Sequence, residues 1–151
     1  MYRFKEFQFG LLMVAPLLGA EILFAYLFLT HAGNNPFTLN SFLGATGGNL
    51  LVCLLFYGMT TTIEGDVLRI SYGIGLIRKT IHLSEIGSVE VVRSPWIYGW
   101  GIRFIPNGML YNIKGLSGVE LTFKGRSRII RIGSSNADAL RDAISKEITR
   151  R

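Results

Sequence analysis

The sequence has little of the chemistry that most enzymes require. It contains one cysteine, Cys53, and two histidines, His31 and His82, among 151 residues. A single cysteine excludes an intrachain disulfide. The histidines and the cysteine show none of the spacings typical of zinc sites or of Cys/His nucleophiles, and no GxSxG or complete GxGxxG motif occurs. We therefore expect a protein that is not an enzyme and that uses no metal or cofactor.

Charged residues are almost missing from two long apolar stretches, 9–30 and 39–57. A helix over the first would be about 33 Å long, which matches the roughly 30 Å hydrocarbon core of a bilayer. The pattern predicts two membrane spans, a transmembrane hairpin that takes up residues 1–58. A cleaved signal peptide is the alternative, since residues 30–32 loosely resemble a cleavage site, but the first stretch is longer than a typical signal core.

Lysine and arginine are absent from the loop between the spans, residues 31–40. Arg3 and Lys5 precede the first span, and every other basic residue follows Tyr57. Positive residues in short flanking segments are retained on the cytoplasmic side of a membrane. We therefore expect both termini of this multi-pass protein to lie in the cytoplasm.

One carboxylate interrupts the first span. Glu21 falls near its middle, where an ionised group costs about 3 kcal/mol or more and usually has a partner. An antiparallel hairpin places Asn49 at the same depth, and Gly44 with Gly48 forms a GxxxG spacing that lets helices approach closely. We predict that these four residues serve assembly within the bilayer, in the hairpin or between copies. The alternative is a proton or ion pathway through Glu21 in an oligomer, although one acidic residue makes no relay chain.

From about residue 60 the apolar pattern changes to a period of two. Seven runs predict strands, at 60–63, 67–72, 77–83, 88–93, 102–105, 119–123 and 129–132, and a further short strand fits 109–113. An amphipathic helix over about 136–149 follows, with Leu140 and Ile144 on its apolar face. We expect an α+β membrane protein in which residues 59–151 form a small antiparallel seven-stranded barrel, or a sandwich, capped by the single C-terminal helix.

Three stretches carry a resemblance to a known family. They read VLRISYGIGLIRKTIHLSEIGSVE at 67–90, YGWGIRFIPNGMLYNIKG at 98–115, and VELTF followed by RIIRIGSSNADAL between 119 and 140. In order and spacing this region resembles the bacterial pleckstrin-homology-like (PH-like) domain that follows two transmembrane helices. The resemblance implies a non-catalytic scaffold, oligomerisation or docking module at the inner (plasma) membrane of a bacterial or archaeal cell.

An aromatic segment, 94–101, reads SPWIYGWG and lacks strict alternation. Tryptophan and tyrosine are enriched at protein-binding hot spots and at membrane interfaces, because each combines a large apolar body with a polar tip. We predict that Trp96, Tyr98, Trp100 and Arg103 bind a partner, which is another membrane-associated protein or a second copy of the chain. The alternative is that these rings cover the mouth of the barrel or pack on the C-terminal helix.

The net charge of +6 arises wholly after Tyr57. Candidate contacts to anionic lipid are Arg78, Lys79, Lys124, Arg126 and Arg128. The first tight turn, 64–66, is acidic where phosphoinositide-binding members of the wider superfamily carry basic residues, which argues against specific headgroup recognition. A sensor of anionic headgroups is therefore the runner-up function. Nucleic-acid binding is not expected, because the charges are scattered and no known module is present.

Overall fold

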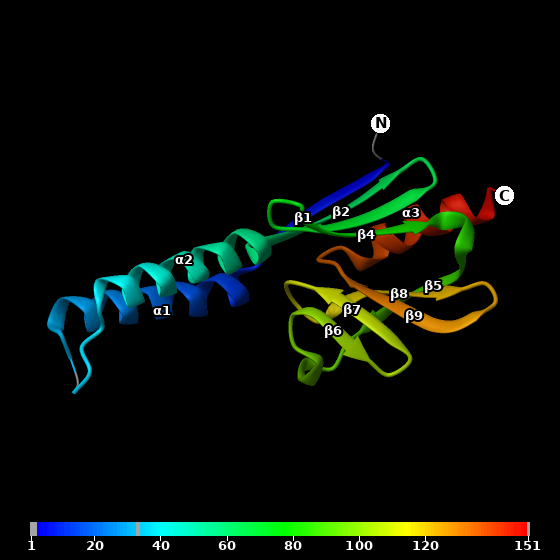
Figure 1. Ribbon diagram of the computed structural model, residues 1–151. Coiled ribbons are helices and arrows are strands. Elements are labelled where there is room, and N and C mark those ends of the chain that lie inside the picture. The colour runs from blue at the N-terminus through cyan, green and yellow to red at the C-terminus, as the bar shows by residue number, and fades with distance from the viewer. Residues whose placement is uncertain (1–2, 33, 151) are drawn as a thin grey trace.

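The computed structural model describes residues 3–32 and 34–150. Within these ranges it is an α+β fold, in which a hairpin of two long apolar helices projects from a β-rich domain (Figure 1). The helices of the hairpin are α1 (Leu11–Thr30) and α2 (Leu39–Phe56), and both are long and apolar enough to cross a membrane. They do not form a protein core, because Val14 is the one buried residue of α1 and α2 has none.

A strand that the sequence did not predict precedes the hairpin. β1 (Phe4–Phe9) lies antiparallel to β2 (Gly58–Glu64), so that Phe4 pairs with Ile63 and Phe9 with Gly58. The predicted span at 9–30 therefore begins too early, because Phe9 belongs to the sheet and Gly10 separates it from α1. The pairing also places the segment before α1 and the segment after α2 at the same end of the hairpin.

Side chains of β1 hold the C-terminal part of the domain. Glu6 accepts hydrogen bonds from the hydroxyl of Ser134 at 2.7 Å and from the backbone N–H of Ser135 at 2.9 Å. Arg3 forms an ion pair with Glu147. Cleavage after residue 32 would remove β1 and all of these contacts. The structure thus favours a retained first helix over a cleaved signal peptide.

The domain consists of two open sheets. The first has the strand order β1-β2-β3-β4, with β3 (Val67–Tyr72) and β4 (Ile77–His82). The second has the order β5-β8-β9-β7-β6, and its strands are β5 (Ile86–Arg93), β6 (Gly101–Ile105), β7 (Gly108–Asn112), β8 (Ser117–Phe123) and β9 (Arg126–Gly133). All pairs are antiparallel except β7 with β9. The prediction of a closed seven-stranded barrel is therefore wrong, since no ladder joins the two sheets in the described residues.

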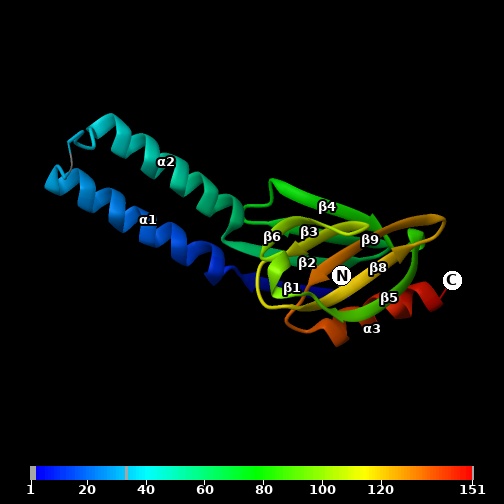
Figure 2. The same cartoon turned by 90° about the horizontal axis from the view of Figure 1, so that it is seen from below.

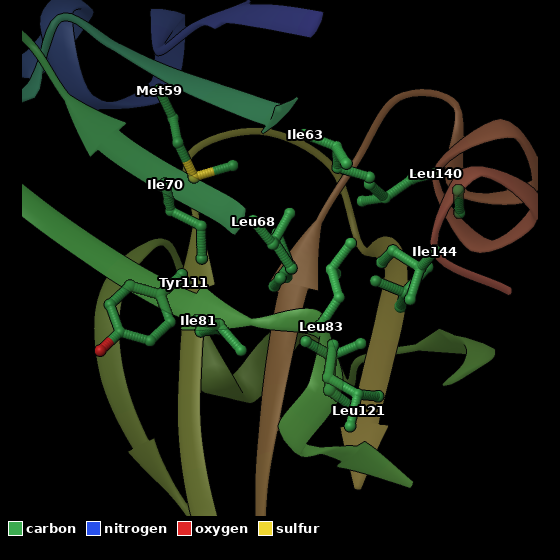
Figure 3. Packing of buried hydrophobic residues seen from close by; sticks show 14 of the residues in the cluster. Met59, Ile63, Leu68, Ile70, Ile81, Leu83, Tyr111, Leu121, Leu140 and Ile144 are labelled. Atoms are coloured by element: carbon green, nitrogen blue, oxygen red, sulfur yellow. The ribbon is translucent and has the colours of Figure 1, made fainter. Parts of the chain in front are cut away.

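One side between the sheets is closed by α3 (Ala137–Thr149), which contacts β5, β8 and the short helix η1 (Leu83–Glu85). Figure 2 shows α3 and β4 on opposite sides of the domain. Leu140 and Ile144 are fully buried and point from α3 into the space between the sheets, toward Ile63 and Leu83 (Figure 3). A helix must bury its apolar stripe, so α3 takes the place that strand pairing would have in a closed barrel. The side between β4 and β6 stays open.

Hydrogen bonds join the hairpin to the domain without an intervening linker. The N–H of Gly10 donates to the carbonyl of Tyr57 at 2.8 Å, and the N–H of Ile74 donates to the carbonyl of Leu54 at 3.1 Å. Gly73 has a φ of 49°, and a Cβ at this position would collide with the carbonyl oxygen of Leu54. The turn between β3 and β4 is therefore fixed to the last turn of α2.

This close approach predicts that Gly73→Ala is far more damaging than Gly65→Ala. Both glycines have positive φ, but a Cβ at Gly65 would meet no atom within 4 Å. Backbone strain alone costs about 1 kcal/mol, whereas the collision at Gly73 raises the expected loss in free energy of unfolding to about 3 kcal/mol. Denaturant unfolding of the full-length protein in detergent, followed by tryptophan fluorescence, measures both variants. Equal losses would contradict the close contact.

Tyr72 is buried where the hairpin meets both sheets, with 1% of its surface exposed. Its ring packs edge-on against Phe56, with the centroids 5.9 Å apart. Its hydroxyl donates to the carbonyl of Asn112 at 3.2 Å. Burial raises the pKa of Tyr72 well above its ordinary value, because an ionised phenol would lose its hydration there.

The raised pKa predicts a loss of stability in alkali. Folded Tyr72 keeps its proton where the unfolded side chain loses it, near pH 10, so its contribution is complete below that pH and falls above it. We expect the free energy of unfolding to lose about 1.4 kcal/mol per pH unit from this group above pH 10. The Tyr72→Phe variant should lack this loss of free energy of unfolding above about pH 10. Unfolding curves of both proteins, measured below and above about pH 10, test the difference. Parallel pH profiles for the two proteins would refute the assignment.

Candidate functional site

The open side of the domain forms a groove between the two sheets. A cavity of about 610 Å³ lies between β4 on one side and β6, β7 and β9 on the other. Its apolar lining includes Ile81, Phe104, Met109, Tyr111 and Ile130. Its charged lining consists of Lys79, Glu85, Arg126 and Arg128. The groove thus combines an apolar floor with a positive rim.

The balance of charge in the groove is positive. Nη1 of Arg126 lies 3.6 Å from Oε2 of Glu85, so the charges of these two side chains partly neutralise each other. Within the described part of the chain, Lys79 and Arg128 form no ion pair. Two cations are therefore left to face whatever enters, which favours a ligand with acidic groups beside apolar ones.

The edge strand β4 borders this groove through Lys79, Thr80 and Ile81. β4 is the last strand of its sheet, and in the described ranges no strand pairs with its outer side. Unpaired N–H and C=O groups on such an edge can pair with an extended segment of another chain. Because Lys79 and Ile81 of β4 line the groove, a segment added at this edge would lie over it.

Sequence reasoning missed the groove, although it named some of its residues. Lys79, Phe104 and Arg128 come from three strands far apart in sequence, and only the fold brings them together. Phe104 is 89% exposed, the highest value among the large apolar side chains described. No local signal marks Phe104, because Ile102, Arg103 and Phe104 alternate as in a half-buried strand, a pattern that predicts Phe104 on the same buried face as Ile102.

The aromatic segment predicted to bind a partner is divided between exposed and covered positions. In the short helix η2 (Trp96–Tyr98), Trp96 is 75% exposed, whereas Tyr98 is half-buried with the Arg131 guanidinium 6.0 Å above its ring. Trp100 is half-buried, and its indole N–H is covered without a hydrogen-bond partner in the described residues. Arg103 donates from Nε to the Trp100 carbonyl at 3.0 Å. Only Trp96 and Arg103 therefore face outward.

The five basic residues predicted to contact lipid are divided: three of them, Lys79, Arg126 and Arg128, line the groove, whereas Arg78 and Lys124 do not. Lys124, Arg126 and Arg128 belong to the β8–β9 turn or its flanks, at the end of the domain farthest from the hairpin (Figures 1 and 2). Arg78 lies at the opposite end of the domain, and its Nε donates a hydrogen bond to the carbonyl of Gly75. Lys79, next to it, lines the groove.

The hairpin contains a polar cluster around Glu21. Its carboxylate accepts hydrogen bonds from the Thr46 hydroxyl at 2.7 Å and from the Asn49 amide at 3.0 Å. Asn49 also donates to the carbonyl of Leu17 at 2.8 Å. The structure thus brings Glu21 and Asn49 together, as their common depth suggested. Sequence reasoning overlooked Thr46, which lies one helical turn before Asn49 and was detectable from that spacing.

Gly44 and Gly48 do not contact α1. A Cβ at either position would meet no atom within 4 Å. The close helix approach that their GxxxG spacing suggested therefore does not occur within the hairpin. Their face of α2 is open, so an assembly role for these glycines requires a helix from a second copy.

We expect the double variant Gly44→Leu with Gly48→Leu to weaken self-association while the chain stays folded. The new side chains enter open space, so the free energy of unfolding should change by at most about 0.5 kcal/mol. Between two copies they would keep the helices apart. Sedimentation in detergent measures the association, with Gly19→Leu on α1 as the matched control. An unchanged monomer–oligomer equilibrium would show that this face is not used.

Comparison of the chain with models of known protein families and with curated proteins finds no match. In the part of the chain that the structure describes, no three His, Cys, Asp or Glu side chains gather where they could hold a metal ion. The groove, the aromatic segment and the polar cluster of the hairpin are thus the features from which a function can be inferred.

Proposed function

We propose that this chain is a membrane-anchored, non-catalytic docking module, whose PH-like domain binds an extended segment of another membrane-associated protein. The observation that carries the proposal is the free edge of β4 beside a positive, apolar groove. A docking surface of this kind needs no catalytic groups. It needs backbone groups to pair and side chains that select the partner.

The anchor is the helical hairpin, placed in the inner (plasma) membrane of a bacterial or archaeal cell. Arg3, Lys5 and all basic residues after Tyr57 flank the end of the hairpin that carries the domain. Basic flanks favour the cytoplasmic side, so the domain and both termini are assigned to the cytoplasm. The pairing of β1 with β2 is consistent with this arrangement, because it requires both strands on one side.

The chemistry of the groove specifies the partner segment. Pairing with β4 demands an extended backbone, and Ile81, Met109 and Phe104 offer apolar contacts to alternate side chains. Lys79 and Arg128 favour acidic side chains between them. The expected partner is therefore a strand-forming segment in which apolar and acidic residues alternate.

Two other functions receive less support from the geometry. As a headgroup sensor the domain would use its basic turns, but Lys124, Arg126 and Arg128 lie at the end away from the hairpin (Figure 1). As an ion pathway the hairpin would need a chain of titratable groups, whereas Glu21 is the single charged residue of α1 and α2 and is held by Thr46 and Asn49.

Site-specific photo-crosslinking in living cells tests the docking proposal. A photoreactive residue replaces Thr80, on the free edge of β4, in the full-length protein. We expect one protein to be joined there through a segment of alternating apolar and acidic residues. The control position is Lys146 of α3, which is exposed on the other side of the domain. Equal adducts at both positions, or adducts with a second copy of this chain alone, would overturn the proposal.

Charge reversal in the groove measures how much its cations contribute to the affinity for the partner segment. The crosslinked segment is synthesised, and its affinity for the purified full-length protein is measured by fluorescence anisotropy. Lys79→Glu combined with Arg128→Glu should weaken binding about tenfold or more, because both groove cations become repulsive. Lys146→Glu, which changes a charge away from the groove, should leave the affinity unchanged. Equal effects of the two changes would show that binding does not use the groove.

A further inference from the structure

Exposed apolar side chains of the domain are unevenly distributed. From Gly58 onward, the described residues include six large ones that are exposed, Ile74, Leu76, Val91, Trp96, Ile97 and Phe104. Four of these six belong to two loops, the β3–β4 turn and the segment of η2. Their exposed fractions are high, 69% for Leu76 and 74% for Ile97. Large apolar side chains exposed together in these two loops indicate surfaces that meet something other than water.

Both loops lie against the ends of the hairpin helices. Ile74 donates its N–H to the carbonyl of Leu54 in the last turn of α2. A Cβ on Gly101, just after η2, would lie 3.4 Å from the Met13 methyl group in the first turn of α1. In Figures 1 and 2 the β3–β4 turn and the η2 turn both occupy the end of the domain that faces the hairpin.

The same end of the domain is basic. The loops at 73–77, 94–101 and 113–117 contain no acidic residue. The third loop belongs to this end because Ile113 packs against Gly10, and it carries the exposed Lys114. Arg78 directly follows the first loop. Lipid phosphate groups are the anions that such cations would meet at a membrane surface.

The lengths of the helices fix the depth of these loops. α1 has 20 residues and α2 has 18. At the rise of an α-helix these span about 30 Å and about 27 Å, no more than the hydrocarbon core of a bilayer. Both helices must therefore use their whole length to cross, so Leu11 and Phe56 lie at the boundary of the core. Loops that pack against these helix ends lie at the level of the headgroups.

We infer that Ile74, Leu76, Trp96 and Ile97 form a lipid-contacting collar that enters the interfacial layer of the bilayer around the hairpin, while Lys114 and Arg78 reach lipid phosphates. The inference rests on the membrane anchoring proposed above but not on the groove. Tryptophan suits this layer because its ring is apolar and its N–H is polar. Lysine and arginine can bury their stems and keep the charge among phosphates. The collar holds the domain in one orientation on the membrane and leaves the groove for a protein.

Tryptophan fluorescence tests the collar directly, because Trp96 and Trp100 are the chain's two tryptophans. The full-length protein with Trp100→Phe is placed in phosphatidylcholine–phosphatidylglycerol nanodiscs that contain lipid brominated near the headgroup. We expect loss of the Trp96 emission. The difference in emission between the wild type and Trp96→Phe measures the quenching of Trp96 in a protein that keeps Trp100. The far-end control carries Trp96→Phe, Trp100→Phe and Ser127→Trp, and its emission should persist.

A deep reporter separates failure of the collar from failure of the anchor. It carries Leu50→Trp, at an exposed position of α2, in the same tryptophan-free background and is read with lipid brominated deep in the acyl chain. Quenching of the deep reporter and of Trp96, with the far-end control unaffected, supports the collar. Quenching of the deep reporter alone overturns the collar and leaves the anchor intact. Equal quenching of Trp96 and the far-end control also overturns it, and an unquenched deep reporter overturns the anchor itself.

Discussion

The pairing of β1 with β2 is the interaction on which the rest of the structure depends. These two strands continue directly into α1 and α2, so the ladder from Phe4 and Ile63 to Phe9 and Gly58 sets the distance and direction of both helices. Through Glu6 the same strand holds the start of α3. A single short strand thereby contacts the hairpin, the first sheet and the segment that begins the C-terminal helix.

The two ends and the two sides of the domain have different surroundings. The collar faces the hairpin, α3 closes one side between the sheets, and the groove opens on the other side, as Figure 2 shows for α3 and β4. If the groove docks a partner as we propose, its position beside the helices would present it at one height and in one orientation. A partner attached to the same membrane would then lose less freedom on binding than a partner in free solution.

Some features of this chain could be predicted from sequence because they depend on local pattern. The apolar runs gave both helices within a few residues, and matched depth brought Glu21 and Asn49 together. β1 was missed because Lys5, Glu6 and Gln8 make its six residues look like the polar flank of the first span, and because its partner strand lies beyond the whole hairpin. Alternation shows which face of a strand is buried but not which edges pair, so the open sheets were mistaken for a barrel. For the same reason Lys79, Phe104 and Arg128 did not emerge as neighbours.

The order of the elements along the chain links folding of the domain to insertion of the helices. β1 leaves the ribosome before α1, yet β2 is made only after α2. If the hairpin crosses a membrane as we propose, the two strands lie on the same side when both helices cross and on opposite sides when one of them does not. A chain with one helix left outside the bilayer would keep β1 and β2 apart, and the core around Ile63 would lose its edge strand. Completion of the first sheet would then distinguish a chain with both helices inserted from a chain with only one inserted.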